Sequence, residues 1–339
     1  MKVLPNLSSI TIKNINIFYG FLFVWVSLWS LPIQVYGQEK DISRILWSAN
    51  WSHDQSCFVV GGVDGKIRIF SGKTFELIRV INNDKAIQRM SWHPKRNLLA
   101  VAAIEDGSKL IDIDKDTIII LQGLNSNGSR AIDWNYNGDM LAFADYEGVI
   151  TLWNQQGKFI RSVTKENTKS NVAIDWHHSK NEFIVLSECV RIYDAEGNLL
   201  QKFEHRKEDV LLLCVQWHPS GDFFVIGDYG DVNYKLQPLL QFWNSDGSLL
   251  SEQNISKSEY RNMSWSKSGK KLATASDALR IWNKKGKLIA EGKSPDNLWG
   301  VDWCPDGKYI VTSSFEGHIK IWDKKARLIK DINFSEAAE

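Results

Sequence analysis

A tryptophan recurs at nearly constant intervals along this chain, and that repetition limits the possible folds more than any other feature. Successive members of the series stand 41, 42, 42, 41, 48 and 38 positions apart: Trp51, Trp92, Trp134, Trp176, Trp217, Trp265 and Trp303. An apolar residue lies two positions before each tryptophan, and a polar turn followed by an apolar segment comes after it. A period of about 40–45 residues is typical of arrays that are built from one small unit.

The unit is clearest between Val301 and Asp323. Pro305-Asp306-Gly307 has the composition of a tight turn, and the segments on either side of the next turn read as strands, one β-branched and one alternating apolar with polar residues. In several repeats a fourth strand follows a glycine hairpin, as in NQQGKFI, DAEGNLL, NSDGSLL and NKKGKLI. Short strands cannot bury both faces of their sheet alone. We therefore predict an all-β fold, a seven-bladed β-propeller with four antiparallel strands per blade.

Each repeat ends its third strand with a bulky residue, usually followed by Asp or Asn, and in the last repeat this pair is Trp322-Asp323. On this pair and on the period, the chain resembles the WD-repeat β-propeller family over about residues 44–332. The resemblance implies a platform for protein binding, although a fold alone does not fix a function. Many members of the family borrow the last outer strand from the N-terminus. Here Arg327 to Ile332 already supplies it, so we expect the ring to close by face-to-face packing.

The first 37 residues have the order of a secretory signal peptide. Lys2 and Lys13 precede an almost continuously apolar run, residues 15–31, and Val35-Tyr36-Gly37 offers a cleavage site before Gln38. An uncleaved membrane anchor is the alternative, with a core at the lower edge of a spanning length. Either reading places the propeller outside the cytoplasm, periplasmic or secreted. The expected divisions are residues 1–37, a short segment 38–43, the propeller 44–332 and a tail 333–339.

The charge of the chain is nearly balanced, with 41 basic and 40 acidic residues. No strand carries a run of Lys or Arg, so we expect no nucleic-acid partner. The four cysteines contain no CxxC pair, which leaves a zinc site without support. A disulfide between Cys57 and Cys304 could join the first and last blades, but burial as small apolar residues is the favoured interpretation. We expect a monomer without a cofactor.

No catalytic motif stands in a suitable context in the sequence. GxSxG, HExxH, P-loop and GxGxxG patterns are missing from any strand–turn–helix arrangement. His93, His177, His178 and His218 occupy equivalent turns of different repeats, where turn structure explains them better than metal binding does. We therefore predict a protein that is not an enzyme.

Two positions of the repeat carry the candidate site residues. All residues directly before the tryptophans are polar, and we expect them to line the central channel: Asn50, Ser91, Asp133, Asp175, Gln216, Ser264 and Asp302. A water-filled channel needs such walls. The alternative is a hard cation held by the three aspartates, although such a cation is usually coordinated by about six oxygen atoms.

The second position lies four residues before each tryptophan, and by resemblance to the family it lies near the channel mouth. Its occupants are Trp47, Gln88, Arg130, Val172, Leu213, Arg261 and Trp299. Trp, Tyr and Arg dominate binding hot spots, so Trp47, Gln88, Arg130, Arg261 and Trp299 are candidate partner-binding residues. The alternative is that Trp47 and Trp299 cap the core between blades. The fifth repeat carries an insertion with Tyr229 and Tyr234, and insertions often map to the binding face.

The prediction for function is an exported, non-catalytic scaffold that binds a protein or peptide. One alternative is a propeller enzyme of the lactonase or lyase type with its site at the channel mouth. Another is an assembly factor tethered to the membrane, which would keep residues 1–37.

Overall fold

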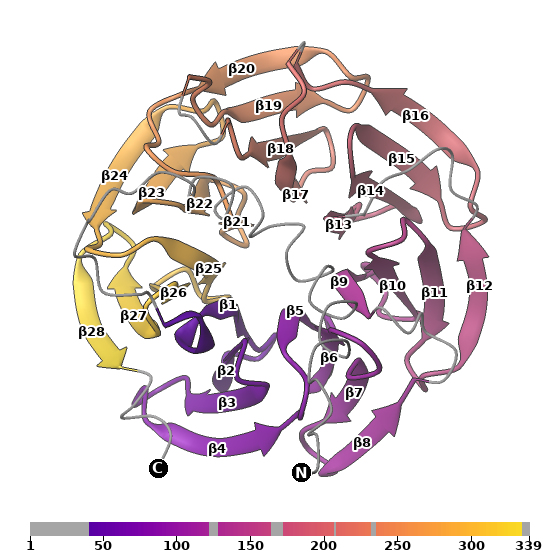
Figure 1. Cartoon of the computed structure of the whole chain (residues 1–339), viewed down its shortest axis with the longest axis vertical. Helices are drawn as coiled ribbons and strands as arrows, with labels where there is room; N and C mark the ends of the chain where they lie inside the picture. Colours follow the sequence, from indigo (N-terminus) through magenta and orange to yellow (C-terminus); the bar gives the residue numbers. More distant parts are fainter. Residues whose placement is uncertain (1–40, 122–127, 164–171, 207, 232–234, 334–339) are drawn as a thin grey trace, which may run out of the picture. The chain divides into compact units, whose positions relative to one another are not determined.

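The computed structural model describes residues 41–121, 128–163, 172–206, 208–231 and 235–333. These residues form one short 3₁₀ helix, Ile42–Arg44, and seven four-stranded antiparallel sheets. The sheets are arranged radially around an axis, as Figure 1 shows. The prediction of an all-β, seven-bladed propeller is confirmed. Within the described residues no helix is both long and apolar enough to cross a membrane.

The sheet order of every blade is the order of the chain. The innermost strands each end at a tryptophan of the series: β1 (Leu46–Trp51), β5 (Ile87–Trp92), β9 (Ser129–Trp134), β13 (Ala173–Trp176), β17 (Leu212–Trp217), β21 (Asn262–Trp265) and β25 (Leu298–Trp303). The second strands are β2 (Cys57–Gly62), β6 (Leu98–Ala103), β10 (Met140–Asp145), β14 (Glu182–Leu186), β18 (Phe223–Asp228), β22 (Lys271–Ala275) and β26 (Tyr309–Ser314).

The two outer layers complete each blade. The third strands are β3 (Lys66–Ser71), β7 (Lys109–Asp112), β11 (Ile150–Asn154), β15 (Val190–Asp194), β19 (Leu240–Asn244), β23 (Ala278–Asn283) and β27 (His318–Asp323). The outermost strands, along the rim in Figure 1, are β4 (Leu77–Asn82), β8 (Thr117–Ile120), β12 (Phe159–Val163), β16 (Leu199–Phe203), β20 (Leu249–Gln253), β24 (Leu288–Lys293) and β28 (Leu328–Asn333).

The core of the ring lies between neighbouring blades. Second strands such as β2 and β6 are buried along their whole length, whereas an outermost strand such as β4 alternates half-buried or buried residues with exposed ones. The seven tryptophans are between 1% and 9% exposed. Each blade therefore buries both of its faces only because it has two neighbours, which is why the unit has to be repeated.

The alternating strand directions define two faces of the ring. Innermost strands begin on one face, where the turns between second and third strands also lie, and we call it the mouth face. They end on the other face, which we call the opposite face, at the turns that join first to second strands. The residues four positions before the tryptophans thus belong to the mouth face.

Histidines on the opposite face connect neighbouring blades. The His177 ring packs edge-on against Trp217 of the next blade at 4.9 Å, and its Nε2 donates to the carbonyl oxygen of Gly221 at 3.1 Å. His218 repeats the arrangement on Trp265 and Gly269. Burial lowers the pKa of both histidines, so the neutral ring is favoured. These histidines are structural, as the turn interpretation expects.

A glycine substitution tests this contact. Gly221 and Gly307 occupy the same turn position in two blades, with φ of +78° and +69°. A Cβ on Gly221 would lie 2.4 Å from His177, whereas a Cβ on Gly307 would meet nothing within 4 Å. Gly307→Ala should cost about 1–2 kcal/mol, the penalty of left-handed backbone. Gly221→Ala should cost about 1–3 kcal/mol more, because it also overpacks the junction. Denaturant unfolding of both variants measures the difference, and equal costs would rule out the His177 contact.

The ring closes between the first and last blades without a shared strand. β28 pairs with β27 inside the last blade, and β1 begins a separate sheet. Side-chain bonds cross the seam: Ser313 Oγ donates to the carbonyl oxygen of Leu46 at 2.8 Å, and Arg44 donates to Asn333 at 2.7 Å. All four cysteines are buried free thiols, so no disulfide joins Cys57 to Cys304. Closure by face-to-face packing is as expected.

Candidate functional site

In five of the seven blades, the position four residues before the tryptophan lies at an irregularity of the innermost strand. In β1, Leu46 pairs with Gly62 and Ser48 pairs with Gly61, which leaves Trp47 as an extra residue. The same register shift leaves four equivalent residues of other blades without a partner residue in the second strand: Gln88, Arg130, Leu213 and Trp299. An extra residue of this kind is a β-bulge, which re-aims its side chain out of the regular alternation. Bulges therefore set the direction of these five side chains at the channel mouth.

Four of the predicted partner-binding residues form one cluster on the mouth face. Trp47 and Trp299 stack with their ring centroids 6.2 Å apart and their planes 7° from parallel. The Arg261 guanidinium lies 4.1 Å from the centroid of Trp299 and 5.8 Å from that of Tyr229. Arg261 also pairs with Glu259 at 2.6 Å. Because all four side chains keep exposed surface, the cluster offers aromatic faces and a cation to a partner.

The remaining candidates lie apart from that cluster. Arg130 stacks over Tyr146 at 5.9 Å, which makes a second aromatic–cation pair on the mouth face. Gln88 is buried, with 8% of its surface exposed, and so offers a partner little. Val172 and Leu213, at the same repeat position, are buried apolar residues. Tyr234 lies outside the described residues.

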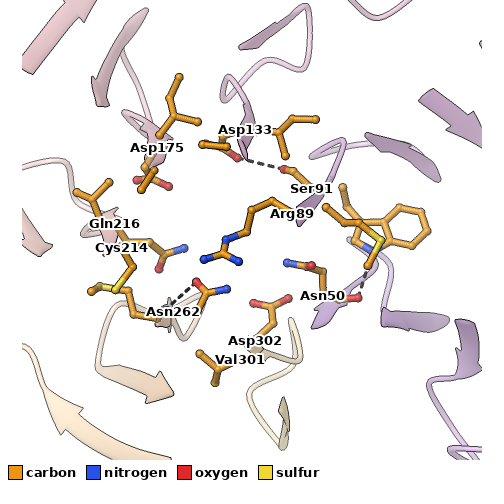
Figure 2. Close-up of a pocket in the computed structure, with 18 of the residues that line it drawn as sticks. Asn50, Arg89, Ser91, Asp133, Asp175, Cys214, Gln216, Asn262, Val301 and Asp302 are labelled. Atoms are coloured by element: carbon orange, nitrogen blue, oxygen red, sulfur yellow. Dashed lines mark hydrogen bonds between the residues drawn. The ribbon is translucent and has the colours of Figure 1, made fainter. Parts of the chain in front are cut away.

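Arg89 is the residue that sequence reasoning missed. It lies three positions before Trp92, where the other blades carry Ser48, Ala131, Ala173, Cys214, Asn262 and Gly300, all smaller. Figure 2 shows its side chain extending into the middle of the channel. A lone arginine at a position otherwise held by small residues is the signal that could have found it.

Arg89 is held by main-chain oxygens of three blades. Its Nη1 donates to the carbonyl oxygens of Trp47 and Gln88 at 3.3 and 3.1 Å, and its Nη2 donates to that of Arg261 at 3.1 Å. Burial lowers its pKa to about 10, with a further contribution from the Arg261 charge. The guanidinium is still a cation at neutral pH, and it lies on the channel axis.

The polar residues directly before the tryptophans connect the blades around the channel. An innermost strand has one free edge, and its N–H groups there need acceptors. Five side chains of the ring supply them, each to the tryptophan main chain of the next blade: Asp133 to Trp176, Asp175 to Trp217, Gln216 to Trp265, Ser264 to Trp303 and Asp302 to Trp51, at 2.6–3.2 Å. Ser91 donates to Asp133, and Asn50 accepts from Ser48.

Three aspartates of this ring have strongly perturbed acidity. Burial raises the pKa of Asp133 to about 7 and that of Asp302 to about 6. Burial, and then the neighbouring charge of Asp133, raise the pKa of Asp175 well above its usual range. Each carboxylate already accepts a main-chain hydrogen bond, and the described residues contain no group of three His, Cys, Asp or Glu suited to a metal ion. The geometry does not favour a cation held by the three aspartates.

These carboxyl groups predict a stability that falls with rising pH. A carboxyl group whose pKa is raised by folding stabilises the protein at low pH, and this contribution is lost as pH rises through the folded-state pKa. His93, His177 and His218 have lowered pKa values and act in the opposite direction, but only below about pH 6.5. Between pH 6.5 and 8 the melting temperature should therefore fall, and Asp133→Asn should flatten the slope. Equal pH slopes of the melting temperature in the wild-type protein and the variant would contradict the assignment of the effect to Asp133.

A cavity of about 290 Å³ occupies the channel. Its walls combine six residues of the polar ring, all but Ser264, with Arg89, Asn262 and Cys214. Burial raises the pKa of the Cys214 thiol to about 12, and its Sγ donates to the carbonyl oxygen of Tyr260, so this thiol is a poor nucleophile. The arrangement is suited to binding through hydrogen bonds and charge.

Seven four-stranded blades form the ring, each anchored by a tryptophan, and side-chain clusters lie at the mouth of the central channel. This arrangement defines the class of WD-repeat propellers. Family models and curated relatives support a relationship to the WD-repeat β-propeller family. Residues 31–71 and 286–323 match the family model described as WD domain, G-beta repeat. Residues 144–301 match the model of eukaryotic translation initiation factor eIF2A.

Curated relatives match parts of the chain at low identity. WD repeat-containing protein 35 of Rattus norvegicus is 22% identical over 282 residues, which are 76% of this chain and 23% of that protein. A probable cytosolic Fe-S cluster assembly factor of Schizosaccharomyces pombe is 29% identical over 134 residues, 35% of this chain and 22% of that protein. The human F-box-like/WD repeat-containing protein TBL1X is 22% identical over 178 residues, which are 48% of this chain and 30% of that protein. The chain spans less than a quarter of the length of the first two.

Proposed function

We propose that this propeller is a non-catalytic scaffold whose protein or peptide partner docks on the mouth face. WD-repeat relatives support a role in protein interaction, and the family is generally non-catalytic. The observation that carries the proposal is the cluster of Trp47, Trp299, Arg261 and Tyr229, which four different blades contribute. Aromatic and arginine side chains near the centre of a surface are the usual source of binding energy.

The exposure of the cluster favours binding over a purely structural role. A tryptophan that only caps the core between blades would be buried like Trp51 or Trp303, which are each 4% exposed. Trp47 and Trp299 instead keep intermediate exposure, and they lie at bulges that turn their side chains out of the sheet. The contact between them still joins the first and last blades, so the two roles are compatible.

A comparative capture experiment tests the docking face. The full chain carrying Trp47→Ala and Trp299→Ala should lose a partner that the wild-type protein retains. The matched control is Ile289→Ala, an apolar residue on the rim that is 48% exposed, and it should retain the partner. A partner lost only by the rim variant would place the docking surface elsewhere. A melting curve of each variant shows whether the ring is intact.

The site of action that we propose is outside the cytoplasm. The support is the sequence of residues 1–37, which lie outside the described residues: two lysines, an apolar run and a cleavage site. N-terminal sequencing of the mature protein should find a start at or near Gln38. A start at Met1 in a membrane fraction would favour the tethered alternative, whereas full-length protein in the cytoplasm would contradict export.

A further inference from the structure

The guanidinium of Arg89 provides a cation at the channel mouth (Figure 2). Among the described residues no carboxylate forms an ion pair with Arg89, whose three hydrogen bonds all go to main-chain oxygens. A guanidinium has five N–H donors. Two of them, Nε–H and one on Nη2, have no acceptor among those residues. Arg89 lines the cavity, so these donors are available to a ligand in the channel.

Two more arginines surround this position. Arg261 is in contact with Arg89 through its carbonyl oxygen, and the charges of Arg89 and Arg261 both lower the pKa of Arg130. Glu259 pairs with Arg261, whereas no carboxylate among the described residues pairs with Arg89. The mouth therefore keeps a positive charge in surroundings where burial strengthens electrostatic interactions.

The aspartates of the channel lie in a deeper layer. Arg89 precedes Ser91, a member of the aspartate-containing ring, by two positions of β5, which corresponds to about 6–7 Å along the strand. The aspartate side chains accept hydrogen bonds from the strand edges and do not pair with Arg89. A group entering from the mouth face reaches Arg89 before it reaches the carboxyl groups.

We propose that the mouth binds an anionic side chain of the protein partner, a carboxylate or a phosphate, through Arg89. This inference rests on the proposed scaffold function and names the chemistry of its partner. The planar guanidinium presents donors that match the paired oxygens of either anion. Trp47 and Trp299 contact the residues that flank the anion, and Arg261 and Arg130 extend the positive surface around it.

The first test uses the unmodified full-length protein labelled with ¹⁵N-arginine. The Nε–H resonance of Arg89, assigned with Arg89→Lys, should shift and saturate on titration with inorganic phosphate and with acetate. Sodium chloride at equal ionic strength should not move it. Arg79, which is on the surface and paired with Asp116, is the internal control. A resonance of Arg89 that moves no more than that of Arg79 would overturn the proposal.

The second test separates the two sources of the anion. A fluorescent decapeptide of alternating glutamate and glycine is compared with its phosphoserine and glutamine counterparts. At least one anionic peptide should bind at least tenfold more tightly than the glutamine peptide, and Arg89→Met should remove this preference. Arg79→Met should leave it unchanged. Equal binding of all three peptides would overturn anion recognition, yet a partner lost by the Trp47 and Trp299 variants would still support the scaffold function.

Discussion

Replacing Trp217 by alanine should lower the free energy of unfolding by about 3–5 kcal/mol, the range for a large aromatic residue removed from a core. Trp217 is 1% exposed and lies between two blades, against Phe224 of its own blade and His177 of the preceding one. Truncation leaves a cavity between two blades, and the closed propeller cannot bring these blades together to fill it. Denaturant unfolding monitored by circular dichroism measures the change.

The control for Trp217→Ala is Leu250→Ala in the same blade. Leu250 lies in the outermost strand β20 and is 52% exposed, so its loss should cost less than about 0.5 kcal/mol. Similar costs for the two substitutions would mean that the tryptophan series does not anchor the blades.

Trp299→Ala should weaken binding of a mouth-face partner by about 2 kcal/mol or more, the size typical of a hot spot. The substitution removes the ring that stacks on Trp47 and supports the guanidinium of Arg261. The propeller should remain folded, because the buried Trp303 and its sheet are untouched. A binding titration, read beside a thermal melt, measures both quantities.

Tyr229→Ala is the companion variant, because Tyr229 lies on the other side of Arg261 and begins the insertion of the fifth blade. It should weaken the same partner less than Trp299→Ala does, since its ring lies farther from the cation. Unchanged affinity in both variants would move the docking surface to the opposite face or to the rim. Loss of the fold together with affinity would assign Trp299 to the core.

The architecture was predictable because one sequence pattern repeats at a nearly constant interval along the chain. A tryptophan every 40 or so residues, each followed by the same succession of turns and strands, determines the number of blades before any contact is known. The fourth strand of the last blade was also visible, in the segment that became β28. Repetition averages out the uncertainty of any single short strand.

The contacts around the channel were only partly predictable. The polar residues before each tryptophan were expected to line the channel, and residues such as Asp133 and Gln216 do line its cavity. The sequence could not show that they accept hydrogen bonds from the next blade, because that depends on the offset between neighbouring sheets. Arg89 was missed for a related reason, since its reach across the axis depends on the small residues opposite it. The bulge at Trp47 is a matter of strand register, which one sequence does not reveal.

At the seam described above, no sheet combines strands from the first and the last blade. Because every blade is one uninterrupted stretch of chain, the junction between the last and first blades differs from the other six in having no connecting loop, and no sheet is shared at any junction. Cutting the chain between any two blades, after a linker had joined its present ends, would divide no sheet. A duplicated or deleted repeat would likewise add or remove a whole blade, which gives such a chain a simple route for changing its size during evolution.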